Sequence, residues 1–284
     1  MAEHSADSNS AVAIDRLAGI FARVRLSARV IHTGRLCGTA AFGEAGAHGH
    51  LHVLREGRLH FKDADGAVRE VAAPALVLYP RPHPHGLEAQ AAGAELVCAE
   101  IALGGPANPL LAALPAVLVL ALDQRTQGLN AILEALFLEV GVRHCGRQVV
   151  MDRLVEAALV HVLRHAMEGW GGVGLLAGLA HPHLARALTA LHDDPAQSWT
   201  LENLADRAGL SRSVFAQLFH RVVGQTPGQY LTGWRLTLAR EALADGRALK
   251  QVAGEVGYAS PAALSRAFSR HFGTNAREVL REAT

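Results

Sequence analysis

The stretch of sequence that decides the fold is LADRAGLS at residues 204–211, because its pattern returns as VAGEVGYAS at residues 252–260. In each copy a small residue near the start would let a neighbouring helix approach closely, and a glycine, Gly209 or Gly257, follows the first helix. Glycine at the end of a helix readily takes the left-handed conformation. The serine that ends each stretch can accept the free N–H groups of the next helix. The repeat therefore predicts two helix-turn-helix units.

The second helix of each predicted unit has one apolar and one polar face. Phe215 and Phe219 in the first copy, and Leu264 and Phe268 in the second, recur at helical spacing on the apolar face. On the polar faces, arginine can pair with guanine edges and glutamine with adenine edges in the major groove of DNA, and other arginines can reach phosphates. The predicted DNA-binding residues are Arg212, Ser213, Gln217, His220 and Arg221 in the first unit and Ala262, Ser265, Arg266, Ser269 and Arg270 in the second.

Between the two units the sequence predicts one long helix. Thr226 and Pro227 are typical of a helix start and Gly246 of a helix end, while Trp234 belongs to an apolar stripe between them. A rigid helix of this kind could hold two recognition helices in successive major grooves, about 34 Å apart. The alternative is an incidental repeat in a helical bundle, but the glycine, the serine and the apolar stripe recur together.

Residues 184–281 resemble the DNA-binding domain of the AraC/XylS family of transcription regulators. The resemblance is carried by WTLENLA at residues 199–205, GLSRSVF at residues 209–215 and GYASPAALSRAF at residues 257–268. It implies binding to double-stranded DNA at promoters, activation or repression of transcription, contact with RNA polymerase, and control by an N-terminal domain. At residues 274–276, TNA replaces the family's usual Ser-Pro, and because proline favours a helix start, the last helix is expected to be looser.

The N-terminal half of the chain has a different period. Between residues 31 and 103, short apolar or alternating runs are separated by turn residues, and Asp65-Gly66 is typical of a hairpin turn. From about residue 128, apolar residues recur at helical spacing over 129–140 and 154–163. The sequence thus predicts an α+β chain with an N-terminal cupin-like β-barrel, then helices, then an all-α domain in which a linker helix joins the two helix-turn-helix units.

The predicted barrel resembles the cupin-type sensing domains of one branch of the same family. HLHVLREG at residues 50–57 and YPRPHPH at residues 79–85 stand where the two cupin motifs would fall, although Pro74-Ala75 departs from the usual Gly-Asp turn. The resemblance implies a site for a divalent metal such as zinc, nickel, iron or manganese. Its candidate ligands are His50, His52, Glu56 and His85. The alternative is a barrel that has kept these histidines without binding metal.

The cysteines provide a second sensing hypothesis. Cys37 and Cys98 lie in predicted strands, and Cys145 lies between two predicted helices beside Arg143 and Arg147. Nearby cations lower the pKa of a thiol and make it easier to oxidise, so these cysteines are candidate redox residues. A buried, inert cysteine is the commoner case. The barrel could instead hold a small organic effector, or the chain could lack an effector altogether.

Three domains are expected along the chain. They are a cupin-like domain over residues 1–125, a helical dimerisation segment and linker over residues 126–178, and the DNA-binding domain over residues 179–284. The glycine-rich stretch at residues 169–178 is the predicted linker. The wide apolar stripes of the two helices before it predict a homodimer.

Composition and targeting features favour a cytoplasmic protein without a membrane span. The formal net charge of the 284 residues is +1, so binding to nucleic acid needs a local basic face. Residues 1–10 do not resemble a secretory signal, and the apolar run at residues 110–122 is too short to cross a membrane.

A sequence-specific transcription regulator is the function that these patterns favour. The alternative is a metal-dependent cupin enzyme with a fused helical domain, which would require a filled metal site. An architectural DNA-binding protein without a sensor is a third hypothesis, and it would bind one promoter and random DNA equally well.

Overall fold

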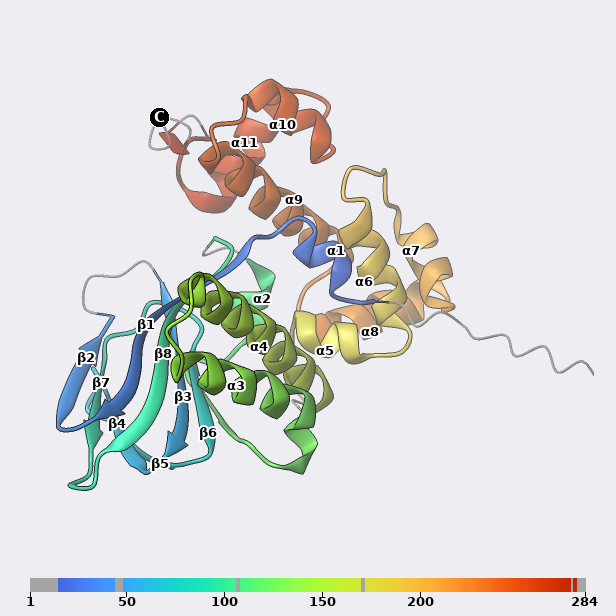
Figure 1. Cartoon of the computed structure of the whole chain (residues 1–284). Helices are drawn as coiled ribbons and strands as arrows, with labels where there is room; N and C mark the ends of the chain where they lie inside the picture. Colours follow the sequence, from blue (N-terminus) through green and yellow to red (C-terminus); the bar gives the residue numbers. More distant parts are fainter. Residues whose placement is uncertain (1–14, 44–47, 106–107, 170–171, 277, 280–284) are drawn as a thin grey trace, which may run out of the picture.

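The computed structural model describes residues 15–43, 48–105, 108–169, 172–276 and 278–279. Two antiparallel sheets face each other in the N-terminal half, and the C-terminal third is helical (Figure 1). One sheet has the strand order β1-β8-β3-β6-β9 and the other has the order β2-β7-β4-β5. The strands are β1 (Leu26–Leu36), β2 (Thr39–Phe42), β3 (Gly49–Glu56), β4 (Arg58–Asp63), β5 (Val68–Ala72), β6 (Ala75–Tyr79), β7 (His85–Ala89), β8 (Ala94–Leu103) and β9 (Leu118–Ala121). The cupin-like fold is confirmed as an open sandwich rather than a closed barrel.

The alternation of side chains along the strands produces this sandwich. The predicted hairpin between β4 and β5 is present, and Gly66 in its turn has a φ of +85°, which favours glycine. Leu59 and Phe61 of β4 pack between the two sheets. Leu51 and Val53 of β3 point to the opposite face of the larger sheet and pack under helices. The central strands of the larger sheet, β3, β6 and β8, are therefore buried on both faces.

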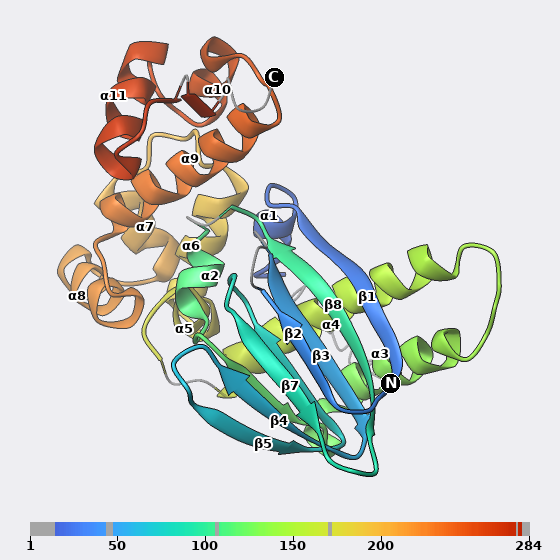
Figure 2. The ribbon, with the colours of Figure 1, turned by 90° about the vertical axis from the view of Figure 1, so that its left-hand side faces the viewer.

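Two helices, α3 (Gln127–Val140) and α4 (Arg147–Gly169), cover the outer face of the larger sheet (Figures 1 and 2). Leu133 and Leu136 of α3 and Leu159 of α4 belong to the same apolar core as the sheet residues beneath them. The apolar stripes behind the homodimer prediction are thus used within the chain, so they no longer support a dimer.

The remaining helical elements include the predicted helices of the C-terminal third and four elements that the sequence does not predict, α1, α2, η1 and α5. They are α1 (Ala18–Phe21), α2 (Pro109–Ala113), the 3-10 turn η1 (Gln124–Thr126), α5 (Leu175–Ala180), α6 (Leu184–Asp193), α7 (Leu201–Ala208), α8 (Arg212–Val223), α9 (Pro227–Ala244), α10 (Leu249–Glu255) and α11 (Pro261–Phe272). Across the described ranges, no helix combines the length and the apolar character that a membrane crossing requires.

Helix α5 begins inside the predicted glycine-rich linker of residues 169–178, of which residues 170–171 lie outside the described part of the chain. Leu175, Leu176 and Leu179 of this helix are buried in the core of the C-terminal helices. A Cβ atom at Gly178 would lie 2.6 Å from Leu188 Cδ1, so glycine allows α5 to pack closely on α6. Gly178 thus serves the packing of these two helices.

The N-terminal segment before β1 packs against the C-terminal helices rather than on the sandwich. Leu17 and Ile20 are buried in the same core as Leu188 of α6. The Arg23 side chain donates a 2.9 Å hydrogen bond from Nε to the His192 carbonyl at the end of α6. The two halves of the chain therefore share one apolar core.

Candidate nucleic-acid interface

The first helix-turn-helix unit is formed by α7 and α8. Gly209 follows α7 with φ +66° and ψ +38°, the left-handed conformation that the sequence predicts for it. Ser211 precedes α8 in an extended conformation, but its side chain makes no capping hydrogen bond, so that predicted role is wrong. In the second unit, Ser260 does accept a hydrogen bond from the Ala263 amide at 3.2 Å.

The recognition helix α8 buries its aromatic face and exposes its polar face. Phe215 and Phe219 are 0% exposed and pack with each other, their ring centroids 5.6 Å apart. Every α8 residue that the sequence predicts to contact DNA is exposed, namely Arg212, Ser213, Gln217, His220 and Arg221. Positions 213, 217 and 220 recur at helical spacing, so they lie along one side of α8.

The second unit repeats this arrangement in α10 and α11. Leu264 and Phe268 of α11 are fully buried. The predicted contact residues Ala262, Arg266, Ser269 and Arg270 are exposed, and Ser265 is half-buried. Each recognition helix therefore presents arginines and small polar side chains outward from a rigid apolar base.

Helix α9 connects the two units, as the sequence predicts. Thr226 and Gln229 form a reciprocal capping pair at its start. Tyr230 and Trp234 are buried along it, and the Tyr230 hydroxyl lies 2.6 Å from Nε2 of His192 at the end of α6. Burial lowers the pKa of His192 to about 3, so this histidine is neutral. The aromatic contacts fix α9 against the first unit.

An ion pair at the start of α8 is not predicted by the sequence. Glu202 of α7 lies 2.6 Å from the Arg212 guanidinium, measured from Oε1 to Nη1. Both side chains are more than half exposed. The pair brings a negative charge beside the predicted DNA-contacting face, and only the fold of α7 against α8 reveals it.

The predicted histidine cluster is formed inside the sandwich. His50 and His52 of β3 and His85 of β7 are all buried, and Nε2 of His52 lies 2.8 Å from Nε2 of His85. Burial and the neighbouring imidazoles hold the pKa of His52 well below its usual value, and burial lowers that of His85 to about 4. Tyr79 stacks on His85 with ring centroids 3.8 Å apart. The rings pack as neutral parts of the core.

These residues do not fit the predicted metal site. Glu56 lies apart from the cluster, at the end of β3, where its exposed carboxylate lies 3.8 Å from the Arg35 guanidinium. His52 and His85 already share a hydrogen bond with each other. In the described part of the chain, no three His, Cys, Asp or Glu side chains are arranged to hold one ion.

The cysteines occupy different environments. Cys98 is buried in β8, directly opposite His52 in the ladder between β8 and β3, and burial raises the pKa of its thiol. Cys37 and Cys145 are exposed, and Cys37 lies just after β1 rather than in a strand. An oxidant in solvent therefore reaches Cys37 and Cys145 before Cys98.

The fold defines a two-sheet sandwich attached to a pair of helix-turn-helix units, each with an exposed polar helix face. Comparison with protein families agrees with this architecture. Residues 15–168 match the family described as Cupin, and residues 204–282 match the family described as Helix-turn-helix domain. The chain belongs to the AraC-type transcription regulators with an N-terminal cupin domain, which confirms the resemblance seen in the sequence.

The named relatives are described as regulators or activators of transcription. A putative AraC-like transcription regulator of Streptomyces lividans is 46% identical over 50% of this chain and 47% of its own length. The RCS-specific HTH-type transcriptional activator RclR of Escherichia coli is 30% identical over 78% of this chain and 80% of its own length. The chain spans about half the length of the first relatives, 47% and 54%. Among solved structures, ToxT from Vibrio cholerae aligns over 93% of this chain and 99% of its own, with 11% identity and a TM-score of 0.41.

Proposed function

We propose that this chain regulates transcription by binding promoter DNA through α8 and α11, under the control of its cupin sandwich. The observation that carries the proposal is the pair of exposed polar faces, each backed by a buried apolar stripe and joined by one helix. Arginine and small polar side chains on such helices are the groups that read base edges and phosphates. The relatives' descriptions as transcription regulators support it.

The exposed side chains divide into two roles. We assign base contacts to Arg212 and Gln217 in the first unit and to Arg266 in the second, because guanidinium and carboxamide groups pair with purine edges. Arg221 and Arg270, near the ends of the two helices, are assigned to phosphates. The remaining contact residues are Ser213, His220, Ala262, Ser265 and Ser269.

The experiment that tests the proposal has two stages. Genome-wide mapping of DNA bound by the full chain identifies its sites, and affinities are then measured for one site and for random DNA. We expect Arg212→Ala and Gln217→Ala each to weaken binding to the site by about 1–3 kcal/mol. Arg153→Ala, an exposed arginine of α4, is the control and should leave affinity unchanged. Equal affinity for the mapped site and random DNA would favour an architectural protein instead.

Further partners belong to this proposal. The family resemblance implies contact with RNA polymerase at promoters, and we include a homodimer of the chain. Exposed Leu138 at the end of α3, with Val149 and Val150 at the start of α4, supplies apolar surface outside the core for a second copy. Sedimentation of the full chain at micromolar concentration tests the dimer, and a monomer there would remove it.

We also propose that the chain is a regulator and not a cupin enzyme. The relatives are described as regulators, and the His50, His52 and His85 rings pack against Phe42 and Tyr79 rather than around a reactive centre. Metal analysis of the purified chain tests this proposal, because stoichiometric bound metal would restore the enzyme hypothesis.

A further inference from the structure

A loop of the sandwich meets the linker helix directly. Strand β8 ends at Leu103, and the next residues, Gly104 and Gly105, lie against Glu241 in the second half of α9. The Gly105 amide donates a 3.1 Å hydrogen bond to Oε1 of Glu241. A backbone group of the sensing half is thus bound to a side chain of the helix that joins the two DNA-binding units.

The approach of this loop to α9 requires a glycine. Gly104 has a φ of +73°, and a Cβ atom there would lie 2.5 Å from Glu241 Oε1 and 2.6 Å from Val24 Cγ1. Any other residue would strain the backbone and push the loop and the carboxylate apart. The sequence at 104 therefore allows the close contact.

The carboxylate of Glu241 is held there against an electrostatic cost. The side chain is half-buried, and burial raises its pKa. The Gly105 hydrogen bond acts in the opposite direction and lowers the pKa, while Asp245, the residue directly after α9, raises it. A partly desolvated carboxylate stays in place when a donor such as this amide compensates it.

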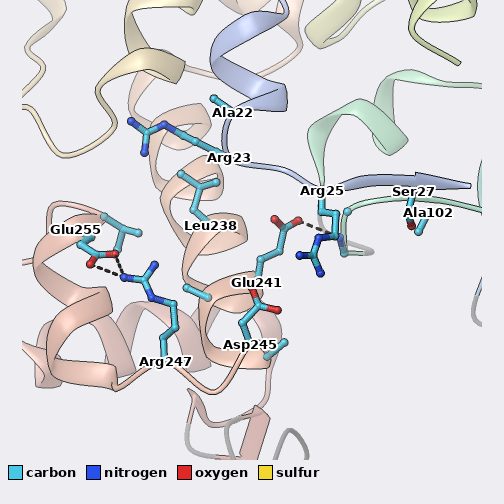
Figure 3. A pocket seen from close by; sticks show the side chains of 15 residues that line it. Ala22, Arg23, Arg25, Ser27, Ala102, Leu238, Glu241, Asp245, Arg247 and Glu255 are labelled. Carbon is cyan, nitrogen blue, oxygen red and sulfur yellow. Dashed lines mark hydrogen bonds and ion pairs between the residues drawn. The ribbon is translucent and has the colours of Figure 1, made fainter. Parts of the chain in front are cut away.

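Apolar packing does not fill the seam beside this hydrogen bond. A cavity of about 510 Å³ lies there, with Arg25 and Ser27 on the sandwich side and Leu238 and Asp245 on the α9 side (Figure 3). Gly105 and Glu241 both line this cavity, so their hydrogen bond lies at its edge.

We propose that Glu241 is a positioning residue for DNA binding. Through the Gly105 amide it sets where the second half of α9 lies, and α9 packs against α10 and α11 of the second unit. The distance between the α8 and α11 faces, and hence the preferred spacing of the two DNA half-sites, depends on this contact. The inference rests on the proposed function, since it concerns how the two units meet DNA.

The test uses the full chain and a set of duplexes in which the mapped half-sites are separated by different numbers of base pairs. We expect the wild type to prefer one spacing, and Glu241→Ala and Gly104→Ala each to reduce that preference by about tenfold, the loss of one charge-assisted hydrogen bond. Glu241→Gln should retain the preference, because its amide oxygen still accepts from Gly105.

Two control variants separate the loss of the Glu241–Gly105 contact from the effects of backbone strain and of a removed charge. Gly66→Ala introduces the same left-handed strain where no atom lies within 4 Å of the new Cβ, and Asp245→Ala removes the neighbouring charge. Both should keep the wild-type spacing preference. Thermal unfolding of each variant establishes that it is folded before DNA is added.

A measurement without DNA distinguishes a failure of the Glu241 proposal from a failure of the proposed DNA binding. Amide hydrogen exchange at residues 236–245 should be faster in Glu241→Ala and Gly104→Ala than in the wild type. Faster exchange with an unchanged spacing preference would overturn the positioning role, and unchanged exchange would overturn the contact itself. If the chain binds no specific DNA, the proposed function fails, while the exchange data still report whether the contact exists.

Discussion

At the scale of single residues, the ion pair between Glu202 and Arg212 shows how a neighbour can control a DNA-contacting side chain. An exposed pair of this kind stabilises a fold by only about 0–1 kcal/mol. Under the proposed function its larger effect is on binding, because Glu202 would compete with DNA for the Arg212 guanidinium. Its negative charge would also lie near the phosphates that approach α8. We therefore expect Glu202 to weaken binding to DNA of any sequence.

Replacing Glu202 with alanine should strengthen binding to random DNA by about two- to fivefold, which corresponds to an exposed ion pair released from competition. The gain should shrink as salt is added, because screening weakens both the pair and the phosphate contacts. Titration of labelled duplexes at several salt concentrations measures this effect. Glu70→Ala, which breaks the similarly exposed pair with Arg58 in the sandwich, is the matched control. No change in Glu202→Ala, on the mapped site as well as on random DNA, would show that Glu202 does not compete with DNA for Arg212.

The buried histidines make the stability of the chain depend on pH. The pKa of His192 in the folded chain is about 3, below the 6.5 of a free histidine, and that of His85 is about 4. Below pH 6.5 the unfolded chain takes up these protons and the folded chain does not. The unfolding free energy is therefore highest above pH 6.5. As the pH drops from 6.5 toward the pKa of each histidine in the folded chain, that histidine lowers the unfolding free energy by about 1.4 kcal/mol per pH unit.

Urea unfolding between pH 7.5 and pH 5 measures this dependence. His192→Gln removes one of the protons and should flatten the fall in unfolding free energy below pH 6.5. Equal slopes in wild type and His192→Gln would mean that His192 is protonated, or reached by water, in the folded chain.

At this scale the sequence predicts which side chains are exposed, but it does not predict which side chains they pair with. The helical period alone predicts that Arg212, Gln217 and Arg266 face outward, and they do. The partner of Arg212 depends on how α7 folds back on α8, and no spacing rule supplies that. For the same reason the cupin motif places His50, His52 and His85 together but also includes Glu56, which β3 carries to its exposed end.

At the scale of single elements, two helix starts with similar backbone conformations differ in whether the preceding side chain makes a capping hydrogen bond. Thr226 and Ser211 both precede a helix in extended backbone, with φ, ψ of −73°, 154° and −67°, 154°. Only the Thr226 side chain accepts a hydrogen bond from its helix, from the Gln229 amide at 3.3 Å. The sequence predicts the position of each helix start correctly, but side-chain rotamers decide which cap forms.

This difference gives a matched pair of variants. Thr226→Ala should lower the unfolding free energy by about 1 kcal/mol, the usual cost of losing a capping side chain. Ser211→Ala loses no hydrogen bond, so it should change stability by no more than about 0.5 kcal/mol. Denaturant unfolding of both variants at neutral pH makes the comparison. A larger loss in Ser211→Ala than in Thr226→Ala would contradict the capping assignment.

At the scale of the whole molecule, the N-terminal segment crosses the expected domain boundary. Residues 17–24 and the segment around α2 share their core with α5, α6 and α9. The sequence predicts separate domains because its glycine-rich stretch is typical of a linker and because no local pattern links residue 20 to residue 188. Contacts between distant segments of this kind become visible only in the folded chain.

The shared core predicts which elements become less stable when a buried side chain is truncated. Ile20→Ala empties a fully buried site between α1 and the C-terminal helices and should cost about 2–5 kcal/mol. Amide exchange should then rise in α6, far away in sequence, where Arg23 binds the carbonyls of His192 and Asp193. Leu59→Ala is equally buried but lies between the sheets, so its exchange should rise in the strands and not in α6. If Ile20→Ala loosened only the sandwich, the N-terminal segment would belong to the N-terminal domain, and the two halves would be joined by the packing of α2 and α4 on α5 and by the contact of the β8 loop with α9.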